Sequence, residues 1–235
     1  MLFQSLKQRV KPYTWLRYML AGGHMQGDEL QHSRRFFSQF GEDAILENFF
    51  WGKSLGFYIE VGAFDPLVYS NTYWFYAKGW RGICIEPNPE LFEKFRARRP
   101  GDTVLNLAVS RSTGEAEFVC AGPYSGILDD NFAVPTERGK GPVIRVPTRP
   151  LRDVLAANLP GGVALDFMSV DCEGHDLTVL ESNNWELFRP SVVLVEDHSG
   201  DPNGPVMRRM CEWNYEPLHR VGLTMLFKAR EFVPA

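Results

Sequence analysis

The stretch that decides the fold is Phe57-Tyr58-Ile59-Glu60-Val61-Gly62-Ala63-Phe64-Asp65-Pro66, in which a short apolar run ends in an acidic residue and a glycine. Gly82-Ile83-Cys84-Ile85-Glu86 is a second such run that also ends in an acidic residue. Both runs predict β-strands. Open α/β sheets bind ligands at the carboxyl ends of their strands, where glycine lets the backbone approach the ligand closely. Each run alone fits a structural turn or a helix cap, but the pair favours a nucleoside-bearing ligand with Glu86 at the ribose.

Strand-like and helix-like segments alternate on both sides of this stretch. The expected strands are 103–109, 116–120, 164–170 and 191–195, and the expected helices are 44–50, 70–78, 89–98, 151–158, 175–181 and 205–213. Ser70 or Asn71 is expected to cap the second helix. Residues 215–219 and 224–228 are expected to form a terminal hairpin. This alternation predicts the α/β class, with a mostly parallel sheet, helices on both faces and an antiparallel edge from the hairpin.

The composition is that of a globular protein. Of the 235 residues, 44% are hydrophobic and 23% are charged, and the net charge of −4 argues against a general nucleic-acid binder. The four cysteines lie far apart, which argues against a disulfide framework or a zinc site and favours a cytoplasmic location. No apolar run reaches the length of a transmembrane segment.

The length suits one large domain with an appendage. We expect an N-terminal helical extension and linker in residues 1–35, and the main domain in residues 36–235. A helix over residues 2–20 fits either a leader packed on the domain or an amphipathic surface or partner helix. Residues 121–142 are rich in Gly, Pro and Asp, which suits a lid-like insertion and a tolerated surface loop equally well.

The absence of two phosphate-binding motifs narrows the choice of cofactor. The sequence has neither Gly-x-Gly-x-x-Gly, typical of NAD and FAD sites, nor Gly-x-x-x-x-Gly-Lys-Ser/Thr, typical of ATP hydrolysis. A cofactor that carries adenosine and an amino acid without phosphates fits better. S-adenosylmethionine is such a molecule, and its sulfonium and ammonium charges suit Glu60 and Asp65.

A second group of acidic and imidazole residues follows two later strands. Ser169-Val170-Asp171-Cys172-Glu173-Gly174-His175 ends one of them, and Glu196-Asp197-His198 ends the next. Such a cluster suits the deprotonation of a hydroxyl group or the binding of a divalent cation. We expect Asp171, His175 and His198 to be catalytic, and any metal to be bound by Asp171, Glu196 and His198. The alternative is that these residues cap helices or are structural.

These motifs together resemble the FkbM family of methyltransferases. The resemblance rests on Ser38–Asp43, Tyr58–Ala63, Ser70–Thr72, Gly79–Pro89 and Ser169–His175, and it extends from about Phe36 to Lys228. It implies a class I methyltransferase fold, which is Rossmann-like, and methyl transfer from S-adenosylmethionine to a hydroxyl oxygen of a sugar or secondary metabolite. The acceptor would then be a small molecule.

The resemblance also assigns roles to residues. Glu60, Gly62 and Ala63 would line the methionine part of the cofactor, Glu86 would hold the ribose, and Asp171 would lie where the methyl donor meets the acceptor. The remaining cofactor-binding candidates are Gln39, Asn71, Thr72, Pro87, Asn88 and Ala108.

Two departures from the family pattern concern the cofactor loop and the acceptor side, and the first of them keeps a second function open. The family's first turn usually continues Ala-Asn-x-Gly, whereas this chain has Ala63-Phe64-Asp65-Pro66, and Thr224 stands where the terminal hairpin often carries Asn. The alternative to an enzyme is a non-catalytic, cofactor-binding partner protein of the same fold. The missing glycine fingerprint argues against a nucleotide-sugar oxidoreductase. The sequence leaves a homo-oligomer open.

Overall fold

The computed structural model describes residues 36–129 and 140–233. The expected extension and linker in residues 1–35 lie outside the described residues, as does the middle of the expected insertion.

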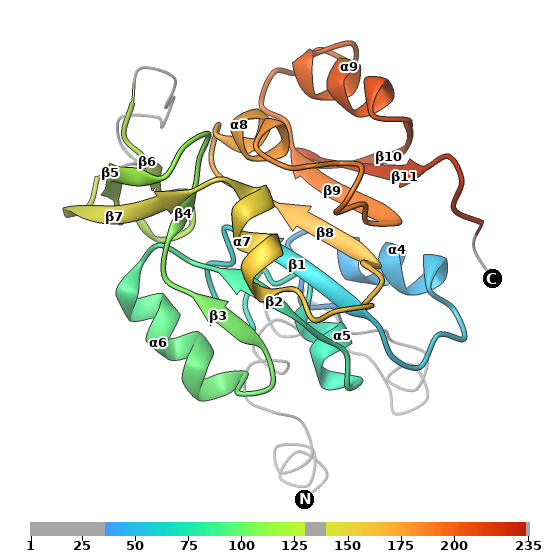
Figure 1. Cartoon of the computed structure of the whole chain (residues 1–235), viewed down its shortest axis with the longest axis horizontal. Helices are drawn as coiled ribbons and strands as arrows, with labels where there is room; N and C mark the ends of the chain where they lie inside the picture. The colour runs from blue at the N-terminus through green and yellow to red at the C-terminus, as the bar shows by residue number, and fades with distance from the viewer. Residues whose placement is uncertain (1–35, 130–139, 234–235) are drawn as a thin grey trace, which may run out of the picture. The chain divides into compact units, whose positions relative to one another are not determined.

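A seven-stranded sheet forms the centre of the fold, in the order β10-β11-β9-β8-β1-β2-β3 (Figure 1). Its strands are β1 (Phe57–Val61), β2 (Arg81–Ile85), β3 (Thr103–Leu105), β8 (Phe167–Val170), β9 (Val192–Glu196), β10 (Tyr215–Val221) and β11 (Thr224–Ala229). The first five pair in parallel, and β11 pairs antiparallel with both β9 and β10. The mostly parallel sheet and the terminal hairpin are therefore confirmed.

The hairpin differs from the expectation in one respect. Its antiparallel strand, β11, lies between β9 and β10, so the edge strand β10 runs in the same direction as the parallel strands. The physical reason is that β11 is the more buried of the two strands and takes the inner position, whereas β10 exposes alternate residues.

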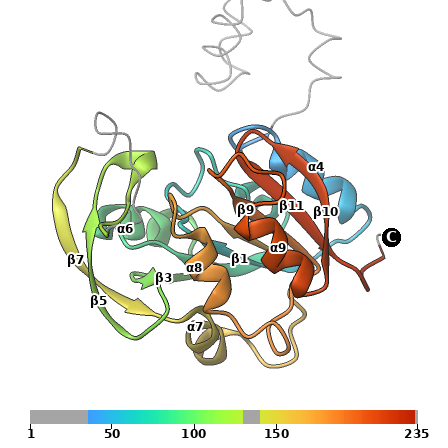
Figure 2. The same cartoon turned by 90° about the horizontal axis from the view of Figure 1, so that it is seen from above.

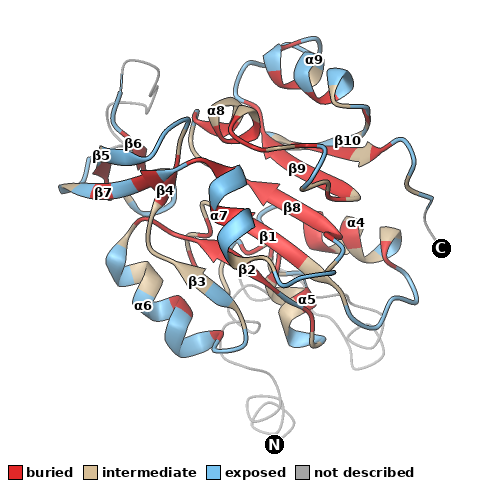
Figure 3. Cartoon of the chain, in the orientation of Figure 1, coloured by how far each residue is buried: buried red, intermediate tan, exposed pale blue. Residues whose placement is uncertain are grey.

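Helices cover both faces of this sheet, as expected (Figure 2). One face packs against α7 (Leu151–Asn158), α8 (Asp176–Glu181) and α9 (Pro205–Glu212) through a large aliphatic cluster. The other face packs against α4 (Glu42–Phe49), α5 (Tyr73–Ala77) and α6 (Pro89–Arg98) through a cluster rich in aromatic residues. Because both faces are covered, the central strands are buried along their length (Figure 3).

The cap of α5 is a further difference. Its N-cap is Thr72 rather than Ser70 or Asn71. The hydroxyl of Ser70 nevertheless accepts a hydrogen bond from the amide of Tyr73 at 3.1 Å. The expected side chain therefore satisfies an amide of the first turn without occupying the cap position.

A second, four-stranded sheet was not predicted. It has the order β4-β7-β5-β6 and contains β4 (Ala108–Val109), β5 (Gly114–Val119), β6 (Gly126–Ile127) and β7 (Val143–Arg149). The single strand expected over 103–109 is therefore two strands in different sheets, and the strand expected over 116–120 belongs to the second sheet. The sheet encloses a small core of its own. Val146 and Thr148 of β7 are buried, but Pro147 stands between them, and a proline inside a short run argues against a strand. This strand was therefore not expected.

Candidate active site

A row of paired residues brings four site residues to one edge of the central sheet. Val61 pairs with Ile85 of β2 and with Val170 of β8, and Val170 pairs with Val195 of β9. The next residues along the four strands are Gly62, Glu86, Asp171 and Glu196. The parallel register therefore places them side by side at the carboxyl ends of the strands, as the sequence predicts.

A cavity of about 290 Å³ opens at this edge, close to the lower end of the range of small-molecule sites, ~300–1,000 Å³. Its walls come from the ends of β1, β2, β8 and β9, from the second sheet and from the turn between β10 and β11. The expected site residues that line it are Gln39, Gly62, Glu86, Pro87, Ala108, Asp171, His175, Glu196 and His198.

Gly62, directly after β1, lies against the backbone of Asp171, directly after β8. Its φ of 76° lies in the left-handed region, and a Cβ at this position would overlap the carbonyl oxygen of Asp171. Only glycine fits here, because any other residue would push the ends of the two strands apart. The cavity wall at Gly62 is therefore formed by backbone atoms, with no side chain between them and a ligand.

Glu86 joins the ends of β2 and β1. Its carboxylate accepts hydrogen bonds from the amides of Phe64 and Asn88, both at 2.7 Å. Burial raises the pKa of Glu86 to about 7, although the two amides oppose the shift. A carboxylate has about four lone-pair sites, so two remain for a ligand in the cavity.

Backbone strain is concentrated around the cavity. Among the described residues, four that are not glycine have a positive φ, namely Phe64, Tyr69, Glu173 and Asn214. The first three line the cavity. The rings of Phe64 and Tyr69 are stacked, with centroids 6.5 Å apart and planes at 19°. Strained conformations persist where the surrounding structure enforces them, and they gather at functional sites.

Glu60 lies behind the cavity rather than in its wall. Its carboxylate accepts a hydrogen bond from the hydroxyl of Thr72 at 2.6 Å and lies 3.6 Å from the guanidinium of Arg99. Arg99 is fully buried and also donates to Asp102 at 2.8 Å and to the hydroxyl of Tyr58 at 2.8 Å. Glu60 and Thr72 thus belong to a buried ionic network under the site.

Four other predicted cofactor residues also contact protein groups rather than the cavity. Asp65 forms an ion pair with Lys94 and accepts hydrogen bonds from backbone amides of its own turn. Ala63 packs in the aromatic core, and Asn71 donates to the hydroxyl of Ser169 at 2.9 Å. Asn88 caps α6. These residues hold the loops around the cavity in place.

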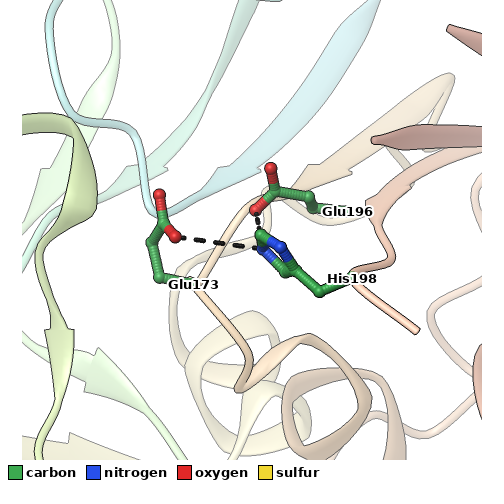
Figure 4. A group of neighbouring side chains, drawn as sticks. All are labelled: Glu173, Glu196 and His198. Atoms are coloured by element: carbon green, nitrogen blue, oxygen red, sulfur yellow. Dashed lines mark hydrogen bonds and ion pairs between the residues drawn. The ribbon is translucent and has the colours of Figure 1, made fainter. Parts of the chain in front are cut away.

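The opposite end of the cavity is acidic (Figure 4). His198 Nε2 lies 2.8 Å from Glu196 Oε2 and 3.9 Å from Glu173 Oε2. The hydrogen bond to Glu196 raises the pKa of His198 to about 9, so His198 is a cation at neutral pH. Burial and the neighbouring Glu196 raise the pKa of Glu173 to about 7.

Asp171 and Glu196 share a hydrogen bond between their carboxyl groups. Although Asp171 is exposed in the cavity wall, the surrounding protein and the Glu196 carboxylate raise its pKa well above the usual range. The pKa of Glu196 is lowered, because hydrogen bonds from His198 and Asp171 outweigh its burial. Of the two carboxyl groups, Asp171 therefore holds a proton more strongly than Glu196.

His175 contributes a second imidazole to the cavity. It is buried, and its Nε2 lies 2.9 Å from Oδ2 of Asp129, in the described part of the expected insertion. Within the described residues its Nδ1 has no hydrogen-bond partner. Residues 122–127 also line the cavity, so this part of the insertion contributes to the site.

One group of three side chains has the spacing needed to hold a cation. Glu173, Glu196 and His198 each offer a ligand atom within 4.8 Å of the others. This group contains Glu173 in place of the expected Asp171. Nε2 of His198 is already engaged by Glu196, so binding of a metal there would break that hydrogen bond.

The sequence interpretation missed most of the apolar wall. The lining residues that it did not name as site residues are Val61, Phe64, Tyr69, Ile85, Leu91, Leu107, Val109, Phe118, Cys172 and Leu223, and residues 122–127 were included only as part of the expected insertion. Glu173 belongs to the expected acidic group that follows the two later strands, and it lines the cavity as part of that group. Val61 and Ile85 end central strands and Leu91 lies on α6, whereas the others come from the second sheet and from loops, whose placement depends on tertiary packing.

These observations define an α/β protein with a small-molecule cavity at the ends of its parallel strands. The family model of the methyltransferase FkbM domain matches residues 60–217, which is more than half of the chain. The chain belongs to this methyltransferase family, which confirms the resemblance seen in its motifs. A comparison with curated proteins found no match. Within the described ranges, no helix is both long and apolar enough to cross a membrane.

Proposed function

We propose that this protein is a class I, S-adenosylmethionine-dependent methyltransferase that methylates a hydroxyl group of a sugar or secondary metabolite. The observation that carries the proposal is the row of strand ends. Gly62 and Glu86 lie toward one side of the cavity, and Asp171, Glu196 and His198 lie toward the other. A cofactor over β1 and β2 would thus present its reactive group to an acceptor near β8 and β9.

The residues at the first side fit S-adenosylmethionine. The free lone pairs of Glu86 suit the ribose hydroxyls, and the bare backbone at Gly62 allows close approach. Ile85, Leu91 and Leu107 supply apolar surface for a purine. Among the described residues that line the cavity there is no Lys or Arg, which suits a cofactor without phosphates. Glu60 and Asp65 would act indirectly, by fixing the loops.

When bound, S-adenosylmethionine supplies an electrophilic methyl group. The residues of the chain position the acceptor for in-line attack and handle its proton. A positive charge beside Asp171 favours its ionised form, because opposite charges stabilise each other. The Asp171 carboxylate then accepts the hydroxyl proton, while Glu196 and His198 hold it in place. His175 is the alternative proton acceptor, since its Nδ1 has no partner in the described structure.

Two measurements on the full chain test this function. Calorimetry with S-adenosylmethionine should show binding, and Glu86→Ala should weaken it at least tenfold. Mass spectrometry should detect a transferred methyl group on at least one member of a panel of sugars and glycosylated metabolites. Binding without transfer to any acceptor would favour the non-catalytic partner protein, and absence of binding would refute the proposed function.

A further inference from the structure

The side of the cavity near Glu196 is bordered by the turn between β10 and β11. Thr224 of β11 pairs with Glu196, and the amide of Asp197 donates to the carbonyl of Leu223 at 3.0 Å. Leu223 itself lines the cavity. The turn therefore lies beside the groups that we assign to the acceptor, at the far side from Glu86.

This turn carries exposed apolar side chains. Leu223 is 41% exposed. Phe40 is 50% exposed and lies against the same turn, since a Cβ on Gly222 would come within 2.6 Å of its ring. Gln39, next to Phe40, lines the cavity. Leu223 thus lies in the cavity wall, and Phe40 lies against the neighbouring residue of the same turn. Single exposed apolar residues are ordinary, but two of them around one turn beside a cavity suit an apolar group of a ligand.

The charges at this side exclude one class of acceptor. Asp171, Glu173 and Glu196 are acidic, and no lining residue in the described part of the chain is Lys or Arg. The nearby Arg220 donates a hydrogen bond to the carbonyl of Asp197 at 2.9 Å, and its guanidinium lies 3.7 Å from the Asp197 carboxylate. The positive charge of Arg220 is therefore balanced by Asp197. The imidazolium of His198 lies on this side, but its Nε2 is already engaged by Glu196. A phosphate group here would lose its hydration and lie beside three acidic side chains, with no unpaired cation among the described lining residues.

We propose that the acceptor is an uncharged hydroxylated ring that bears an apolar group, and that this group lies over Phe40 and Leu223. Sugars activated as phosphates or nucleoside diphosphates are excluded by the same charges. The inference rests on the proposed function and adds the class of acceptor to it. The hydroxyl of the ring would face Asp171, and the apolar group would cover the turn.

The first test measures methyl transfer by the full chain to a set of matched acceptors. Hexyl glycosides of several neutral hexoses and deoxyhexoses are set against the methyl glycosides and the 1-phosphates of the same sugars. Methyl transfer is followed by mass spectrometry. We expect kcat/KM for the best hexyl glycoside to exceed that of its methyl counterpart roughly tenfold, because burial of several methylene groups contributes to binding. The 1-phosphate should show no transfer.

The second test locates the apolar group. Leu223→Ser should raise KM for the hexyl glycoside and bring the ratio of hexyl to methyl kcat/KM close to one. Leu187→Ser is the matched control, because Leu187 is 72% exposed and does not line the cavity, and it should leave the ratio unchanged.

Three outcomes would overturn this inference while leaving the proposed function intact, provided that calorimetry shows binding of S-adenosylmethionine. The first is that the 1-phosphates are methylated as well as the hexyl glycosides. The second is that no hexyl glycoside is preferred over its methyl glycoside. The third is that Leu223→Ser leaves the ratio of hexyl to methyl kcat/KM unchanged. A fourth is that Leu223→Ser changes only the oligomeric state in size-exclusion chromatography, which would show that a second copy covers the turn. Failure to bind S-adenosylmethionine would instead refute the proposed function together with the inference.

Discussion

Gly62 and Asp171 are packed so closely that the carbonyl oxygen of Asp171 occupies the position where a Cβ of residue 62 would be. The contact joins the ends of β1 and β8. It places the backbone at which we expect the cofactor directly beside the carboxyl group that we assign to the acceptor. The packing of two strand ends therefore sets the distance between the two halves of the proposed site.

We predict that Gly62→Ala destabilises the protein and removes binding of S-adenosylmethionine. A side chain at this φ of 76° costs about 1–2 kcal/mol, and the overlap with Asp171 adds to that cost. Gly162→Ala is the matched control, because Gly162 has a φ of 77° but open space around its Cβ position. Thermal unfolding should show the larger loss of Tm for Gly62→Ala. Equal losses in the two variants would contradict the packing argument.

Removal of the Arg99 cation from the buried network should lower the stability of the fold. Arg99→Met leaves the buried carboxylates of Glu60 and Asp102 without their counter-ion, which costs about 3–5 kcal/mol. Lys94→Met removes a half-exposed cation from Asp65 and should cost at most about 1 kcal/mol. Denaturant unfolding measures both. A similar small loss for both variants would show that the network does not stabilise the fold.

The stability of the protein without ligand should fall as the pH rises from 6 to 9. In the folded state the pKa values of Glu86, Glu173 and Asp176 are raised to about 7, and that of His198 to about 9. All four groups bind more protons folded than unfolded in this range, so deprotonation favours unfolding. Carboxyl groups with lowered pKa values, such as Asp65, change the stability only at more acidic pH, where they become protonated.

Thermal unfolding across this range measures the effect. Glu86→Gln should flatten the decline between pH 6 and 8, because it removes one of the titrating groups. His198→Asn should flatten it at the upper end. A Tm that rises with pH would show that these groups do not hold their protons in the folded state.

The parts of the fold that the sequence predicts are those with a continuous local signal. β1 and the helices α6 and α7 have the expected bounds, because each combines an apolar pattern with a turn or a proline at its start. β7 was not predicted, because Pro147 stands inside it and a proline within a short run weakens the strand signal. Local signals do not show which strands will meet in space.

The candidate site shows the same division. The row formed by Gly62, Glu86, Asp171 and Glu196 was predicted, because parallel strands align their carboxyl ends. The surroundings of Glu60 were not predictable, since nothing near it in sequence shows that Arg99 would be fully buried beside it. An acidic residue near a strand end can face a ligand or a buried cation, and tertiary packing decides between them.

Turnover should depend on the carboxyl pair and on His198 far more than cofactor binding does. Asp171→Asn and His198→Asn remove the proposed proton acceptor and the cation that holds Glu196, so kcat should fall by about 10²–10⁴. The Kd of S-adenosylmethionine, measured by calorimetry, should change only a few-fold. His219→Asn is the control, because His219 is exposed on β10 and does not line the cavity. Full turnover in Asp171→Asn, with loss of turnover in His175→Asn, would transfer the role of proton acceptor to His175.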